Sequence, residues 1–96
     1  MQFEWDPEKA QSNAGKHGVS FEEAITTFYN PLSATVYDPD HSEREHRYIT
    51  VGYSSRDRLL VVAHAERGDN IRVISARPAT PHERRKHERE SPRRQR

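Results

Sequence analysis

The sequence predicts an α+β fold, in which helices are segregated from an antiparallel sheet rather than alternating with its strands. Three observations lead to this prediction. Two helix-start signals lie close to the N-terminus, alternating and apolar runs fill the middle of the chain, and a third helix-start signal follows them. The chain has 96 residues, of which 31% are hydrophobic, so we expect one small domain with a thin core over residues 1–90. Residues 91–96 form a basic tail that we expect to be disordered.

The N-terminal part is predicted to hold a short strand and two helices. Residues 3–5 alternate between apolar and polar side chains, as a strand does. Asp6 and the proline after it start a first helix, which we expect to end at Gly18. Ser20 starts the second helix, with Glu23 completing a capping box. Its apolar side chains recur at i, i+3, i+4 and i+7, and they predict the main helical contribution to the core: Phe21, Ala24, Ile25 and Phe28.

The remainder is predicted to be an antiparallel meander of three or four strands followed by a basic helix. Residues 34–37 read as a short strand, and residues 47–53 alternate with apolar side chains on one face. Residues 58–66 are apolar on both faces, which indicates a central strand, and residues 71–77 return beside it. A second capping box and a proline open the C-terminal helix, which we expect over residues 80–90.

Several classes of protein are excluded by composition. The chain has no cysteine, so it has no disulfide framework, no thiolate metal site and no cysteine nucleophile. It lacks an apolar run long enough for a membrane span and opens with no signal peptide, so we expect a cytoplasmic protein that does not bind membranes. His82 and His87 are five residues apart, which is the wrong spacing for a zinc helix, and the polar loop around His41 lacks the pattern of a calcium loop. We therefore predict no metal and no cofactor.

Charge is polarised along the chain, although the net charge is only +1. Residues 1–43 carry two lysines against eight carboxylates, whereas residues 82–96 carry seven cations against three carboxylates. Thirteen of the sixteen cations are arginine, which favours bidentate contacts with phosphate or carboxylate. An acidic front and a basic back suggest two surfaces with different partners, and the alternative is a solvated surface of mixed charge.

The turn at Gly68-Asp69 predicts a β-hairpin that gathers titratable side chains. A two-residue turn sets a register that can be counted back along both strands. The predicted pairs are Arg67 with Asn70, Glu66 with Ile71, Ala65 with Arg72, His64 with Val73, Val62 with Ser75 and Leu60 with Arg77.

This register predicts which side chains share a face of the hairpin. His64 and Glu66 lie on one face, and Arg67 and Arg72 lie on the other. The same count places Arg77 on the face opposite Arg72. The alternative is an ordinary exposed hairpin with charge pairs.

Such a cluster has the groups needed to cut RNA without a metal. The 2′-hydroxyl of RNA is a built-in nucleophile, which a base such as His64 or Glu66 would deprotonate. An arginine would stabilise the charge that grows on the phosphate, and an acid would protonate the leaving 5′-oxygen. The product would carry a 2′,3′-cyclic phosphate, and DNA would not react because it lacks the nucleophile.

The sequence also resembles the BrnT family of toxins. Residues 3–24 read FEWDPEKAQSNAGKHGVSFEEA, and the family characteristically reads W-D-x-x-K followed by N-x-x-K-H-G-V-x-F-x-E-A. Residues 66–80, ERGDNIRVISARPAT, are similar to the family as well, and the resemblance covers about residues 3–90. It implies a RelE-like fold and a ribonuclease that inhibits translation within a type II toxin–antitoxin system. It also implies a BrnA-like antitoxin that neutralises the toxin and binds operator DNA.

The resemblance and the chemistry together give a set of candidate residues. The resemblance points to Arg67 and Arg77 for activity, and the chemistry adds His64 and Glu66. Arg72, Arg84 and Arg85 are candidates for contacts with the RNA backbone. The expected partners are RNA, the antitoxin and, within the antitoxin complex, operator DNA, with a homodimer left open.

Two other functions remain open at this point. One is a catalytically inactive toxin-like module that binds an antitoxin and serves in autorepression of the operon. The other is a non-toxic RNA-binding domain, against which the small number of aromatic side chains available for base stacking counts.

Overall fold

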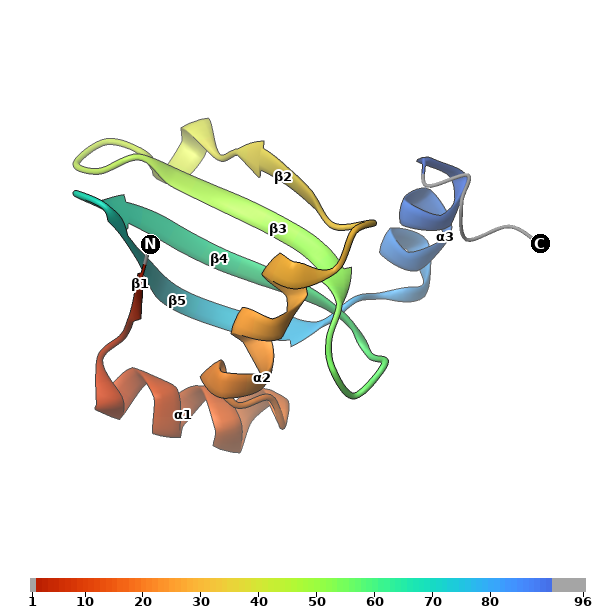
Figure 1. The fold of residues 1–96 in the computed structure, drawn as a ribbon, viewed down its shortest axis with the longest axis horizontal. Coiled ribbons are helices and arrows are strands. Elements are labelled where there is room, and N and C mark those ends of the chain that lie inside the picture. Colours follow the sequence, from red (N-terminus) through yellow and green to blue (C-terminus); the bar gives the residue numbers. More distant parts are fainter. Residues whose placement is uncertain (1, 91–96) are drawn as a thin grey trace.

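The computed structural model describes residues 2–90, and the predicted basic tail, residues 91–96, lies outside this range. A twisted sheet forms the centre, with α1 and α2 packed on one of its faces and α3 at one end (Figure 1). The strands are β1 (Gln2–Glu4), β2 (Ala34–Tyr37), β3 (Arg47–Tyr53), β4 (Leu59–Arg67) and β5 (Asn70–Pro78). The helices are α1 (Pro7–His17), α2 (Phe21–Thr26) and α3 (Pro81–Glu90), with short 3-10 helices η1 (Thr27–Tyr29) and η2 (Pro39–His41).

The predicted α+β class is confirmed, and the sheet has five strands in the order β1-β5-β4-β3-β2. Strands β2 to β5 are antiparallel to their neighbours along the chain, whereas β1 pairs in parallel with β5, with Gln2 beside Asn70. The N-terminal strand therefore joins the sheet next to the last strand, and α1 and α2 follow from this edge.

Helix α1 is anchored by a polar side chain rather than by an apolar face. The Asp6 carboxylate caps it by accepting a hydrogen bond from the Glu8 amide at 2.8 Å, and Gly18 ends it with a φ of 69°, a conformation that glycine adopts without strain. Asn13 is buried, and its amide group donates to the carbonyls of Val19 and Ala76 and accepts from the Ala76 amide. Asn13 thus pairs with the backbone of β5 beyond the end of β1, as a neighbouring strand would.

Helix α2 supplies the centre of the core. Phe21 and Ala24 are fully buried against β4 and β5, and a neighbouring set of residues completes the core: Val19, Leu60, Val62, Val73 and Ala76. The capping box predicted at Ser20 is half formed. The Ser20 hydroxyl accepts from the Glu23 amide at 3.0 Å, but the Glu23 carboxylate turns away to bind Arg58 and the Ser54 hydroxyl.

Helix α3 begins as predicted. The Thr80 hydroxyl accepts from the Glu83 amide at 3.1 Å, and the Glu83 carboxylate accepts from the Thr80 amide at 2.9 Å, which completes the capping box. The helix projects beyond the end of the sheet (Figure 1) and buries His87 beside Tyr53, with 5.9 Å between the ring centroids. None of the helices within residues 2–90 is both long and apolar enough to cross a membrane.

A β-bulge changes the predicted register of the β4–β5 hairpin. The pairs from Arg67 with Asn70 to His64 with Val73 are confirmed. The register then shifts between Ala63 and His64, so Ala63 pairs with Ser75. The predicted pairs Val62–Ser75 and Leu60–Arg77 are wrong for this reason, because β5 carries one extra residue there.

The bulge also moves Arg77 to the other face. Arg77 pairs with Val61 of β4, and Arg72 pairs with Ala65 of β4. Because Val61 and Ala65 are four residues apart on β4, both arginines project from one face. The expectation that Arg77 lies opposite Arg72 is therefore wrong. A strict alternation cannot anticipate an extra residue within a strand.

Candidate functional site

The face of the sheet opposite α1 and α2 carries three arginines around small side chains. We call it the open face. Arg47 of β3 and Arg72 of β5 flank Ala65 in one row across the sheet. Ile49, Ala63 and Ser75 form the next row, and Arg77 follows beside Val61. Because Ala63, Ala65 and Ser75 are small, the floor between the arginines is low.

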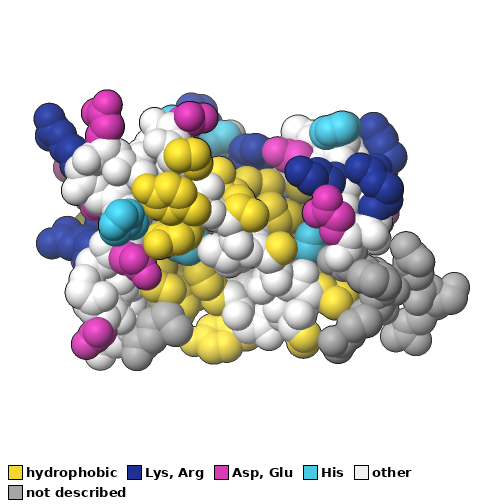
Figure 2. Space-filling model, turned by 90° about the horizontal axis from the view of Figure 1, so that it is seen from above, with side chains coloured by type: hydrophobic (Ala, Val, Ile, Leu, Met, Phe, Trp, Pro, Cys, Tyr) yellow, Lys and Arg dark blue, Asp and Glu magenta, His cyan; other side chains and the backbone are white. Residues whose placement is uncertain are grey.

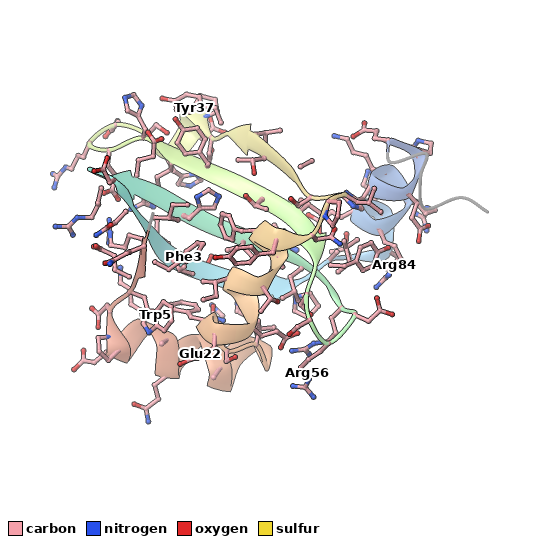
Figure 3. The ribbon with its side chains drawn as sticks, viewed as in Figure 1. Phe3, Trp5, Glu22, Tyr37, Arg56 and Arg84 are labelled. Atoms are coloured by element: carbon pink, nitrogen blue, oxygen red, sulfur yellow. The ribbon has the colours of Figure 1, made fainter. Side chains whose placement is uncertain are left out.

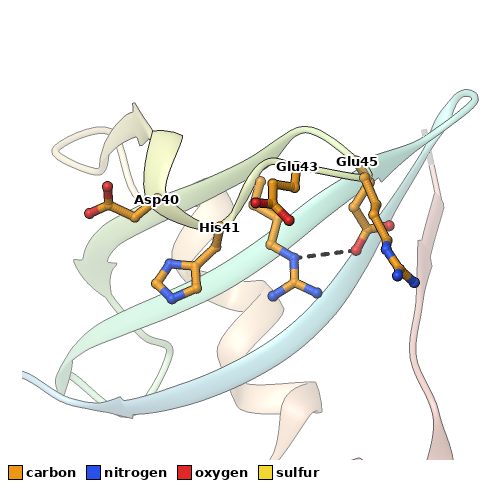
Figure 4. Close-up of a pocket in the computed structure, with 6 residues that line it drawn as sticks. Asp40, His41, Glu43 and Glu45 are labelled. Atoms are coloured by element: carbon orange, nitrogen blue, oxygen red, sulfur yellow. Dashed lines mark hydrogen bonds and ion pairs between the residues drawn. The ribbon is translucent and has the colours of Figure 1, made fainter.

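The loop between β2 and β3 overhangs this floor and creates a pocket of about 290 Å³, which we call the open-face pocket. Arg47 and Arg77 line it, Ala63 and Ser75 belong to its floor, and His41 contributes to its wall. A second hollow of about 430 Å³ adjoins it beneath the same loop and shares His41 and Arg47 (Figure 4). The second hollow has a lining of mixed charge, with Asp40, Glu43 and Glu45 beside two arginines.

His41 and Asp38 form a hydrogen-bonded pair at the wall of the pocket. The short helix η2 places them three residues apart, with 2.9 Å between His41 Nδ1 and Asp38 Oδ2. The His41 side chain is 65% exposed, so its other ring nitrogen is accessible to a ligand. A carboxylate on Nδ1 favours the tautomer that leaves Nε2 free to accept a proton, which is how histidine serves as a general base.

Each arginine of the open face is held by a carboxylate. Arg77 donates two hydrogen bonds to Glu83 of α3, at 2.8 and 2.9 Å, and they lower the pKa of Glu83 to about 2. Arg47 and Arg72 both bind Glu45, and the Arg72 hydrogen bond is the main cause of a lowered Glu45 pKa. The three guanidinium groups are therefore fixed in position before any ligand arrives.

The structure separates His64 from the arginines. His64 is 5% exposed and lies on the helix-covered face of β4, where its Nε2 is 2.8 Å from the Thr50 hydroxyl. The ring packs against Phe28 and Tyr48, with centroid distances of 4.8 and 6.0 Å. Burial lowers the pKa of His64 to about 4, so the ring is neutral at pH 7. Its position suits a structural role.

The other predicted residues are spread over the molecule. Glu66 shares the face of His64 and lies beside the Tyr48 hydroxyl at 3.4 Å. Arg67 projects from the opposite face at the hairpin end, where it pairs with Glu4 at 3.6 Å. Arg67 lies six residues along β4, or ~20 Å, from Val61, the partner of Arg77, so these two arginines do not form one site. Arg84 (Figure 3) and Arg85 are both exposed on α3.

The sequence analysis missed the residues that line the open-face pocket together with Arg77. Asp38, His41 and Arg47 belong to a loop and a strand end, where no periodicity marks a face. A local signal was present, because Asp38 precedes a proline and lies three residues before a histidine, a pattern that starts a helical turn and pairs the two side chains. Within residues 2–90, no three His, Asp or Glu side chains are grouped as metal ligands.

Comparisons with known proteins agree with this fold. The family model for the ribonuclease toxin BrnT of type II toxin–antitoxin systems matches residues 5–83. The chain is also similar to the Brucella abortus ribonuclease toxin BrnT, whose crystal structure was solved at 1.1 Å. The two share 24% identity with a TM-score of 0.62, over 83% of this chain and 97% of that one. No curated protein matches significantly. The chain therefore belongs to the BrnT family of ribonuclease toxins of type II toxin–antitoxin systems, a class whose members have an antitoxin partner.

Proposed function

We propose that this protein is an RNA endonuclease that cleaves without a metal at the open-face pocket. The observation that carries the proposal is the placement of Arg47 and Arg77 at the pocket with His41 on its wall. Two fixed guanidinium groups suit two phosphates of one RNA strand. The His41 ring would then lie between the bound RNA strand and the solvent. Membership of a ribonuclease family supplies the substrate class.

The reaction follows from these groups. His41 takes the proton of a ribose 2′-hydroxyl, and the oxygen attacks the adjacent phosphorus. The bond from phosphorus to the 5′-oxygen breaks, and that oxygen leaves with a proton from a water molecule or a protonated side chain. Arg77 or Arg47 stabilises the extra negative charge on the phosphate in the transition state. The products are a 2′,3′-cyclic phosphate and a free 5′-hydroxyl.

Asp38 and Glu83 act as positioning residues in this scheme. Asp38 binds Nδ1 of His41 and orients the ring, as a carboxylate does in other histidine bases. Glu83 ties Arg77 to α3 and so holds the guanidinium at the rim of the pocket. Of the earlier candidates, Arg77 lines the open-face pocket, and Arg72 lies on the same face of the sheet without lining the pocket. His64 and Glu66 lie on the other face.

A cleavage assay tests the proposal. The purified protein is incubated in EDTA with a single-stranded RNA and with DNA of the same sequence. We expect RNA products ending in 2′,3′-cyclic phosphate and intact DNA. Arg77→Ala should lower the cleavage rate by roughly 100- to 1000-fold, and His41→Asn by at least about 100-fold. Arg56→Ala is the matched control, because Arg56 is 73% exposed in the turn between β3 and β4, and it should cleave normally. Intact RNA with the wild-type protein would contradict the proposal.

The proposal also includes an antitoxin partner and an effect on translation. Cleavage of messenger RNA in the cytoplasm would inhibit translation, as the resemblance to BrnT toxins implies. A BrnA-like antitoxin would neutralise the toxin by covering the open-face pocket, and it would link the complex to operator DNA. An acidic segment of the antitoxin suits this surface, since it would compete with Glu45 and Glu83 for the arginines.

A second function is favoured by one observation. The arginines of the open face are already paired with carboxylates, which lowers their attraction for phosphate. An inactive module that binds only an antitoxin would show this pairing as well. Two results together would establish this alternative. The protein would leave RNA intact in the assay above, and its complex with an antitoxin would repress the operon.

A further inference from the structure

A second group of side chains lies on the helix side of the sheet, at the corner that α1 and α2 leave uncovered. It consists of Tyr37 from β2 (labelled in Figure 3), His46 from the residue just before β3, Tyr48 from β3 and Glu66 from β4. We call it the aromatic corner. The Tyr37 ring lies 5.5 Å from the Tyr48 ring and 5.9 Å from the His46 ring. The Tyr37 residue is 47% exposed, a large fraction for an aromatic side chain in a thin-cored domain.

The aromatic corner packs against rings that lie deeper in the molecule. Tyr48 stacks on the buried His64 ring with an interplanar angle of 20°, and His64 in turn packs against Phe28 of η1. A row of rings therefore runs from the core to the surface and ends at Tyr37. An aromatic ring held in this way loses little conformational entropy when a flat ligand stacks on it.

The corner adjoins the open-face pocket around the end of one hairpin. Tyr37 directly precedes Asp38, and His46 directly precedes Arg47, while Asp38 and Arg47 line the pocket. Successive side chains of a strand project to opposite faces, so the corner and the pocket are two sides of the same strand ends. In Figure 2, hydrophobic side chains are exposed on the surface between charged groups. A ligand that passes around this hairpin end contacts both.

The charges at the corner favour a base over a phosphate. Glu66 lies 3.4 Å from the Tyr48 hydroxyl. Burial, followed by the charge of Glu66, raises the pKa of Tyr48. A carboxylate at this place repels phosphate, whereas it accepts hydrogen bonds from the exocyclic amine of a base. The aromatic faces beside it suit a nucleobase, since every base has a π-face on which rings stack.

We infer that the aromatic corner is a nucleobase-binding subsite, in which Tyr37 stacks on an unpaired base of the RNA whose backbone occupies the open-face pocket. The inference rests on the proposed ribonuclease function and adds to it a site for substrate recognition. Glu66 gives the subsite a preference for bases that carry an exocyclic amine. The sequence analysis counted aromatic side chains as few, but the fold brings several of them together here.

Binding of a non-cleavable RNA tests the inference. The probe is a fluorescently labelled, single-stranded 2′-O-methyl RNA, and its affinity is measured by anisotropy. Tyr37→Ala should weaken binding roughly 5- to 100-fold, and Tyr37→Phe should restore it, because stacking needs the ring and not the hydroxyl. Tyr29→Ala is the control, because Tyr29 is 77% exposed on η1, and it should bind as the wild type does. Thermal unfolding of each variant shows that the fold is retained.

The outcomes separate this inference from the proposed function. A wild-type protein that cleaves RNA, with equal affinity for the Tyr37→Ala and Tyr37→Phe variants, overturns the subsite and leaves the ribonuclease intact. A wild-type protein that neither binds nor cleaves RNA overturns both. If the effect of Tyr29→Ala equals that of Tyr37→Ala, the stacking is unspecific and the subsite is likewise overturned.

A second binding measurement tests the preference for bases that carry an exocyclic amine. The wild type should bind a probe with cytosine at each position more tightly than one with uracil, which lacks the amine. Glu66→Ala should remove this difference while Tyr37 continues to stack. A preference that is the same in Glu66→Ala and in the wild type contradicts the role given to Glu66.

Discussion

The N-terminal segment that resembles BrnT toxins and the pocket that we propose as the active site are built in opposite ways. Within the N-terminal segment, the part from residue 13 to residue 24 buries five side chains: Asn13, Val19, Phe21, Glu23 and Ala24. The open-face pocket is lined by a loop and by strand residues outside that segment, and its histidine is largely exposed. The N-terminal motif therefore specifies the scaffold, whereas the second similar segment, residues 66–80, contributes Arg77 to the proposed site.

Three residues of this motif have a clear structural role. Asn13 pairs with the backbone of β5, and Gly18 turns the chain with a positive φ. Glu23 binds Arg58, which also donates to the Gly18 carbonyl at 3.0 Å. These contacts join α1 and α2 to the sheet. Substitutions in the two regions should therefore have different signatures, and the predictions below test this difference.

The largest expected effect is on stability. Phe21→Ala removes a fully buried ring from the centre of the core, and it should lower the free energy of unfolding by about 3–5 kcal/mol. Chemical denaturation measures this change, and Tyr29→Ala, at an exposed ring, is the control with little effect. RNA cleavage by Phe21→Ala should fall only in proportion to the folded fraction. A loss below about 1 kcal/mol would show that Phe21 does not hold the core.

Acid should expose the structural role of His64. Its pKa is lowered by burial to about 4 in the folded protein, against about 6.5 in the unfolded chain. Between these values the unfolded chain binds more protons, so stability falls as the pH drops from about 6.5 to about 4, by about 3 kcal/mol in all. His64→Leu should remove this dependence, whereas His41→Leu should keep it. Equal acid sensitivity of His64→Leu and the wild type would contradict the assignment.

Local signals were sufficient for much of the fold and insufficient for the site. The caps at Asp6 and Thr80 and the stripe from Phe21 were readable, because they depend on residues within one or two turns of a helix. The first four pairs of the β4–β5 hairpin followed from the turn. The bulge could not be predicted from the sequence, because it reflects packing of the whole sheet.

That one bulge decided much of the candidate site. It placed Arg77 with Arg72 and Arg47 on the open face, where a plain alternation separates Arg77 from Arg72. The position of His41 over the sheet depends on how the loop before β3 folds back, which neither propensity nor period describes. His64 was predicted as a base because its chemistry fits, but the sequence does not show that α2 and η1 cover its face.

A smaller loss of stability is expected from Asn13. Asn13→Ala leaves the amide and carbonyl of Ala76 and the carbonyl of Val19 without this partner, and one such buried group costs about 1–3 kcal/mol. We expect a loss of about 2 kcal/mol in chemical denaturation, with normal cleavage by the folded fraction. Asn13→Asp tests the assignment further, because it keeps the acceptor but removes the donors. Full stability of both variants would contradict the anchoring role.

The smallest expected effect is at Gly18. Its φ of 69° is strained for other residues, although a methyl group there would meet no atom within 4 Å. Gly18→Ala should therefore cost about 1 kcal/mol through backbone strain alone, and Gly15→Ala, within α1, should be neutral or stabilising. Thermal unfolding of the pair measures the difference. A Gly18→Ala variant as stable as Gly15→Ala would show that this turn does not constrain the motif.

The most direct test of the proposed site is to locate bound RNA on the folded protein by NMR. A non-cleavable 2′-O-methyl oligonucleotide is titrated into the isotope-labelled protein, and backbone amide shifts are followed. We predict the largest shifts at Ala63, Ser75 and Arg77 and in the loop that carries His41, with small shifts along α1. Large shifts confined to α1 or α3, with the open face unchanged, would contradict an active site on the open face.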